Sequence, residues 1–143
     1  MRNKRGQIQL SFGMIFSIVL IIVFIGFAFF VIQKFLGLQD SVKISQFSDN
    51  LQKDVNVVWN SDQSSQTKSY SLPSSIKEVC FVNTNGDDVV LNGANGYSAP
   101  GGNIENLNIS AITSSSNSCF PVVNGNVNLI LQKNFGDTLV TVH

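Results

Sequence analysis

The sequence predicts an α+β protein in which a long N-terminal helix, transmembrane first and amphipathic afterwards, is followed by a small antiparallel β domain. Residues 7–33 contain no charged side chain, residues 34–60 repeat apolar positions with helical spacing, and residues 76–143 alternate β-rich runs with turn-forming residues. These three observations divide the chain into a basic leader (1–6), a transmembrane helix (7–33), an amphipathic helix extension (34–60), a linker (61–75) and an extracytoplasmic β domain (76–143).

Charge is unevenly distributed along the 143 residues, although the formal net charge is zero. Three bases precede the apolar run, and all nine acidic residues follow it. The part beyond the run has no arginine and no cluster of lysines. We therefore expect no binding of nucleic acid through phosphate neutralisation.

The apolar run is long enough to cross a lipid bilayer, which takes roughly 20 residues of helix. A charge at the bilayer centre would cost about 2.5–3.5 kcal/mol on insertion scales, and residues 7–33 carry none. Because Arg2, Lys4 and Arg5 flank the run on its N-terminal side, the N-terminus is expected in the cytoplasm and the β domain outside it.

Two other interpretations of the run are open. The run could be a helix buried in a soluble core, but the rest of the chain, residues 34–143, is too small to surround so long an apolar helix. It could also be a cleaved secretory signal, whose apolar region should measure about 7–15 residues and end at a small-x-small site. The run is longer than that, and Gly26 and Ala28, followed by Phe29, make a poor cleavage site.

The N-terminus carries a short motif, Lys4, Arg5 and Gly6 followed by Gln7, directly ahead of the apolar run. This motif resembles the class III signal peptide of archaeal type IV pilin-like proteins, and the N-terminus is also similar to those of small uncharacterised archaeal membrane proteins. The resemblance implies a pilin-like fold and cleavage between Gly6 and Gln7 by a membrane-embedded prepilin peptidase. The helix would then anchor the protein and later form the core of a cell-surface filament, in contact with further copies or other pilin-like subunits.

One position departs from that family pattern. Many pilins carry a glutamate five positions after the cleavage site, where this chain has Ser11. An assembly step that uses the carboxylate is therefore in question. The alternative is a single-pass surface or binding protein that is anchored in the membrane and never polymerises, and a third interpretation is an accessory subunit of a larger membrane complex.

The helix offers two sets of packing positions. Gly13 and Ser17 have the small-xxx-small spacing that lets membrane helices approach closely, although such residues are also common in isolated spans. Further along, apolar residues recur at steps of three and four and predict a buried stripe on the helix. The members of this stripe are Ile44, Phe47, Leu51, Val55 and Val58. The stripe could contact another subunit or the chain's own β domain.

The β domain is predicted from short apolar runs and the turns between them. Residues 76–82 and 89–91 form strands around a turn at 83–88, and residues 127–133 and 138–143 form a hairpin. Residues 92–103 are expected to be a loop. A weak strand is expected where four apolar residues follow that loop: Ile104, Leu107, Ile109 and Ile112.

Two covalent features are predicted on the outer side. Cys80 and Cys119 are the only cysteines and are expected to form a disulfide, with two buried free thiols as the alternative. Asn108 begins the only Asn-x-Ser/Thr sequon and is a possible glycosylation site, although such triplets arise by chance in a chain rich in Asn and Ser.

The sequence offers little that points to catalysis. Its one histidine is the last residue, His143, and no cysteine–histidine set has zinc spacing. Asp87 and Asp88, with the nearby asparagines, supply oxygen ligands but match no calcium-binding loop and are ordinary turn residues. We therefore predict no enzyme activity, no metal and no cofactor.

Overall fold

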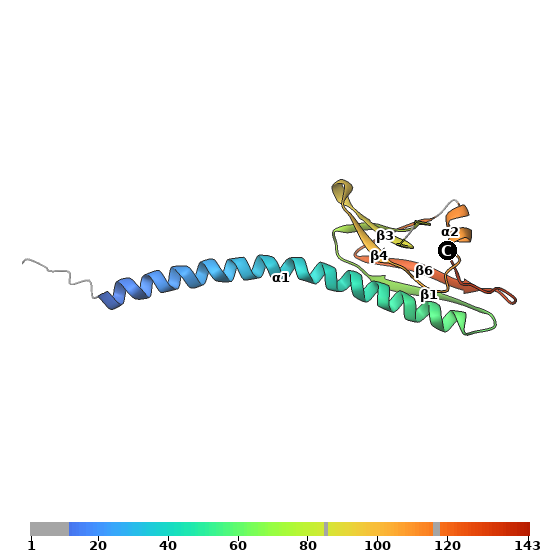
Figure 1. Ribbon diagram of the computed structural model, residues 1–143, viewed down its shortest axis with the longest axis horizontal. Coiled ribbons are helices and arrows are strands. Elements are labelled where there is room, and N and C mark those ends of the chain that lie inside the picture. Colours follow the sequence, from blue (N-terminus) through green and yellow to red (C-terminus); the bar gives the residue numbers. More distant parts are fainter. Residues whose placement is uncertain (1–11, 85, 116–117) are drawn as a thin grey trace, which may run out of the picture. The chain divides into compact units, whose positions relative to one another are not determined.

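The protein is described by a computed structural model, which covers residues 12–84, 86–115 and 118–143 (Figure 1). The predicted leader and the start of the transmembrane helix lie outside these residues. The chain divides into two compact units with their boundary between Leu38 and Gln39, and helix α1 (Phe12–Trp59) contributes to both. The α+β class is confirmed, with a long apolar N-terminal helix followed by small antiparallel sheets.

The strands of the second unit form two sheets. The first has the order β1-β6-β7 and contains β1 (Ser64–Ser71), β6 (Asn126–Lys133) and β7 (Thr141–Val142). The second has the order β4-β3-β2-β5 and contains β2 (Ile76–Phe81), β3 (Val89–Gly93), β4 (Ser98–Gly102) and β5 (Cys119–Pro121). Neighbouring strands are antiparallel throughout both sheets.

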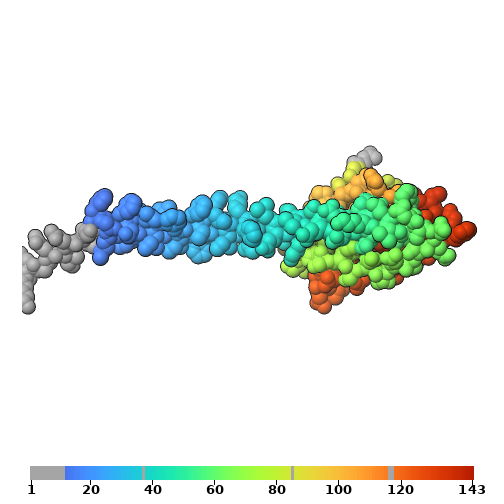
Figure 2. Space-filling view, turned by 90° about the horizontal axis from the view of Figure 1, so that it is seen from below, coloured from blue at the N-terminus to red at the C-terminus, as the bar shows by residue number. Residues whose placement is uncertain are grey.

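The core of the second unit lies between α1 and the sheets. Of the predicted stripe, Ile44 is partly buried, and the four others are no more than 1% exposed. In Figure 2 the green C-terminal part of α1 lies beside the surface formed by β1. The stripe therefore packs within the chain, against strand residues that include Tyr70, Phe81, Leu91, Leu129 and Leu131.

The C-terminal end of α1 is fixed by a side chain from the first sheet. The Lys133 ammonium donates hydrogen bonds to the carbonyl oxygens of Trp59, at 2.7 Å, and Ser61, at 2.9 Å. The last carbonyls of a helix have no partner in the helix and carry partial negative charge, so a cation here both caps and stabilises the end.

The predicted linker is wrong over residues 64–71, which form β1. This strand is almost entirely polar, and only Tyr70 among its residues is buried. It is held by a regular antiparallel ladder to β6 that runs from Ser64 opposite Lys133 to Ser71 opposite Asn126. A strand stabilised mainly by its partner leaves little apolar alternation in the sequence.

Two further predictions in the β domain are wrong. Residues 92–103 are not a loop: β3 continues to Gly93, a 3₁₀ turn, η1 (Ala94–Gly96), follows, and β4 pairs with β3. The predicted weak strand is instead the short helix α2 (Ile109–Ser114), preceded by an irregular segment. Asn108 caps this helix, because its side-chain oxygen accepts a hydrogen bond from the backbone N–H of Ala111 at 3.0 Å.

The other two strand pairs agree with the prediction. β2 and β3 pair around the turn that precedes Val89, and β6 pairs with β7 near the C-terminus. The second turn is closed by Asp137, whose backbone N–H donates to the Asn134 carbonyl at 3.1 Å and whose carboxylate accepts from the Asn134 N–H at 3.0 Å. Turn chemistry and alternation together predicted this hairpin.

Candidate functional site

The main candidate for a functional surface is the first unit's part of α1. It belongs to α1, the one helix among the described residues that is long and apolar enough to cross a membrane. The segment lies near the N-terminus, and no part of its most apolar stretch is buried. Large hydrophobic side chains are exposed on all sides of it; Phe24, Phe27 and Phe29 are each 64% exposed. Exposed apolar surface of this extent fits a helix in a lipid environment.

The few polar groups of this segment suit such an environment. The Ser17 hydroxyl donates to the Gly13 carbonyl at 2.8 Å, so its hydrogen-bonding capacity is met inside the helix. Lys34 is the first charge after the apolar run, and its ammonium lies 5.8 Å from the centroid of the Phe30 ring. Gly13 and Ser17 are exposed, and their predicted role in helix–helix contact stays a prediction.

The predicted processing site, Lys4, Arg5, Gly6 and Gln7, lies outside the described residues, as does Ser11. Its role stays a prediction from the sequence.

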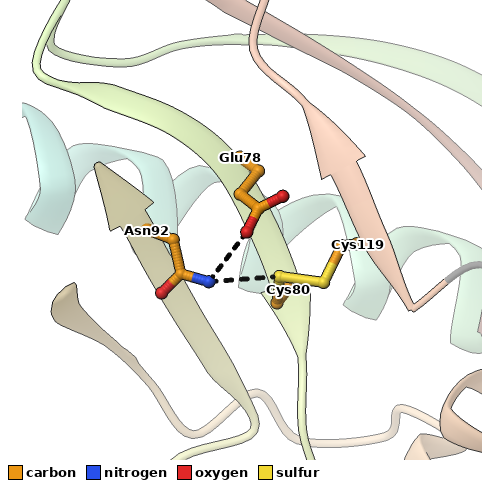
Figure 3. The surroundings of a disulfide bond; sticks show 4 residues. All are labelled: Glu78, Cys80, Asn92 and Cys119. Atoms are coloured by element: carbon orange, nitrogen blue, oxygen red, sulfur yellow. Dashed lines mark hydrogen bonds between the residues drawn. A yellow bond between two sulfur atoms is a disulfide. The ribbon is translucent and has the colours of Figure 1, made fainter. Parts of the chain in front are cut away.

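The predicted disulfide between Cys80 and Cys119 is present (Figure 3). The two residues are direct partners in the β2–β5 ladder, with 4.0 Å between their Cα atoms. The backbone N–H of Phe81 bonds to the Ser118 carbonyl, which makes the cysteine pair a non-hydrogen-bonded position, where side chains come closest. The bond therefore ties the short edge strand β5 to the centre of its sheet.

Polar side chains surround the disulfide. The Asn92 amide donates to a Glu78 carboxylate oxygen at 3.0 Å and lies 3.5 Å from the Cys80 sulfur (Figure 3). Glu78, Cys80 and Cys119 bring a carboxylate and two sulfurs within 4.8 Å of one another. Because a metal binds thiolates and both sulfurs are joined in the disulfide, this grouping is no metal site in the oxidised protein.

A second polar cluster joins β1 to α1. The Asp54 carboxylate accepts a hydrogen bond from the Tyr70 hydroxyl at 2.9 Å and pairs with the Lys68 ammonium at 3.0 Å. The pKa of Tyr70 is raised well above its ordinary value. Burial of the hydroxyl is the largest cause, and the hydrogen bond to Asp54 and the charge of Asp54 add to it. The Tyr70 ring also packs edge-on against Phe47, with ring centroids 5.5 Å apart. Sequence reasoning missed this cluster, since β1 was expected to be a linker.

The sequon residue Asn108 is half-buried at the start of α2, where its side-chain oxygen serves as the helix cap. Its predicted glycosylation stays a prediction from the sequence. Elsewhere, the carboxylate of Asp88 accepts from the backbone N–H of Ile104 at 3.1 Å, which gives this acidic residue a structural partner.

Comparison with protein-family models, with curated proteins and with solved structures found no match to this chain.

Proposed function

We propose that the chain is an integral membrane protein whose α1 spans the bilayer up to about Lys34. The observation that carries this proposal is the run of exposed apolar side chains on every side of α1, from Phe12 to Leu38. Its N-terminus lies in the cytoplasm, because the three basic residues of the leader precede the span. The disulfide supports the opposite location for the β domain, since such bonds persist outside the reducing cytoplasm.

Within this frame, the protein acts as a pilin-like subunit of a surface filament or of a related assembly. Two features support this function: the leader motif that resembles a class III signal peptide, and the order of an apolar helix followed by a β domain. After cleavage between Gly6 and Gln7, the helix is held by the bilayer and later by the helices of neighbouring subunits. The apolar surface of α1 is buried in both states.

The second candidate is a membrane-anchored surface protein that does not polymerise, and Ser11 favours it because many pilins carry a glutamate there. Shearing intact cells distinguishes the two candidates. A filament subunit is recovered in the sheared, pelletable fraction, whereas a non-polymerising protein stays with the membranes.

A variant with a blocked leader makes the shearing test specific. Replacing Gly6→Val should prevent processing and keep the chain in the membrane fraction with its leader attached, because the peptidase site no longer has a residue without a side chain. Asn3→Ala is the matched control in the same leader and should behave as the native protein. Recovery of the Gly6→Val chain in sheared filaments would exclude the processed-subunit proposal.

A further inference from the structure

The second unit carries an open groove of about 600 Å³ between residues 41–48 of α1 and the chain around β4. Apolar atoms form much of its surface, with Ile44 and Ala99 among the lining residues. Its polar lining residues include Ser41, Ser45, Asp87 and Tyr97. This set combines an aromatic ring, a carboxylate and hydroxyls in one hollow.

Tyr97 is the most distinctive residue of the groove, since half of its surface is exposed (50%). Its backbone is fixed by a tight turn: the Gly93 N–H donates to the Tyr97 carbonyl at 2.7 Å, and the Tyr97 N–H donates to the Ala94 carbonyl at 3.2 Å. The ring lies against Gly93, where an added Cβ would come within 2.9 Å of the ring atom Cδ1. The turn therefore holds an exposed ring in a defined place.

The polar side chains of the groove differ in how they are used. The Ser48 hydroxyl is committed to the chain itself, because it donates to the Gly101 carbonyl at 2.6 Å. Among the described residues, the side chains of Ser41, Ser45, Asp87 and Tyr97 make no hydrogen bond to one another or to any neighbour. These groups are available to a ligand from solution.

The composition of the lining limits the class of ligand. Its described residues include one acidic group and no Lys, Arg or His, which disfavours phosphates, sulfates and other anions. An aromatic face contacts the aliphatic C–H face of a sugar ring, and a carboxylate accepts hydrogen bonds from adjacent sugar hydroxyls. Serine hydroxyls both donate and accept, as sugar hydroxyls do.

We propose that this groove binds a neutral saccharide, with Tyr97 stacking on a sugar ring and Asp87 accepting hydrogen bonds from its hydroxyls. The serine hydroxyls of α1 complete the polar contacts from the opposite side of the groove. The site lies entirely within the second unit, and it does not depend on whether the protein polymerises.

The test uses the full chain in phospholipid nanodiscs, because detergents with sugar headgroups would compete for the groove. An array of neutral hexose and N-acetylhexosamine oligosaccharides is the probe, and the best binder is then titrated. Tyr97→Ala should weaken binding about tenfold, which is the scale of an aromatic contact, and Asp87→Asn should also weaken it. Phe135→Ala is the matched control, since this aromatic is 83% exposed on a different turn, and it should leave binding unchanged.

Two results would overturn the proposal. The first is that no neutral saccharide on the array binds the native chain. The second is that Tyr97→Ala and Asp87→Asn bind as tightly as the native chain, which would place the saccharide elsewhere. Circular dichroism of each variant distinguishes loss of binding from loss of fold.

Discussion

The phenolic oxygen of Tyr70 lies 2.9 Å from a carboxylate oxygen of Asp54, and this hydrogen bond connects the polar strand β1 to helix α1. Tyr70 is 5% exposed, so its hydroxyl cannot exchange this partner for bulk water without local opening. The strand that bears it has no other buried side chain. The contact is therefore central to holding β1 against the helix.

Replacing Tyr70→Phe should lower the free energy of unfolding by about 1.5 kcal/mol, because a hydrogen bond to a charged acceptor is lost while the ring remains. Urea unfolding followed by the fluorescence of Trp59, the only tryptophan, measures the effect. Tyr97→Phe removes a hydroxyl that has no partner among the described residues and serves as the control. Equal stability of the two variants would show that the Tyr70 bond contributes nothing.

The same contact makes stability fall at alkaline pH. Burial and Asp54 raise the pKa of Tyr70 above the ordinary value of 10.0. The folded state therefore keeps the Tyr70 hydroxyl proton at pH values where the unfolded state loses it. The stabilisation from this hydrogen bond is complete below about pH 10 and declines as the pH rises further. In the Tyr97→Phe chain, absorbance at 295 nm should show that Tyr70 ionises only as the domain unfolds. Ionisation of Tyr70 near pH 10 in a chain that is still folded would contradict this prediction.

Two valines on one helix test the assignment of the buried stripe. Val55 is fully buried and Val57 is 58% exposed. Val55→Ala should lower the free energy of unfolding by about 2 kcal/mol, from lost burial and the cavity left behind. Val57→Ala should change it by less than about 0.5 kcal/mol. A larger loss for Val57→Ala would mean that this face of α1 is covered in the protein under the conditions of the measurement.

The stripe and the two confirmed strand pairs could be predicted because their apolar side chains recur with the period of the element they form. Strand β1 could not be predicted in this way. Its serines, Gln66, Thr67 and Lys68 are held by antiparallel pairing with β6 and not by burial of their side chains. The short helix α2 was missed because two isoleucines three residues apart suit a helix as well as a weak strand.

Parts of the site could also be predicted. The disulfide followed from a single pair of cysteines, which were expected to lie on the outer side. The groove could not be predicted, because Asp87 and Tyr97 approach residues 41–48 only through the packing of the second sheet against α1.

The disulfide should contribute strongly to the stability of the β domain. Closing a loop of 39 residues stabilises by about 3–4 kcal/mol in the chain-entropy treatment. We expect the Cys80→Ala, Cys119→Ala double variant to unfold at correspondingly lower urea concentration, and the native chain to match it after reduction. The bond itself is checked by mass spectrometry without reductant, where two alkylatable thiols in the native protein would disprove it.

The central claim, that the chain is processed like a pilin and keeps its apolar helix, is tested most directly by the N-terminal residue of the protein isolated from its native membranes. Mass spectrometry of the N-terminal peptide should find a chain that begins at Gln7 and contains the whole apolar run. A chain that begins at Met1 would contradict the processing, and one that begins beyond the apolar run would contradict the membrane anchor as well.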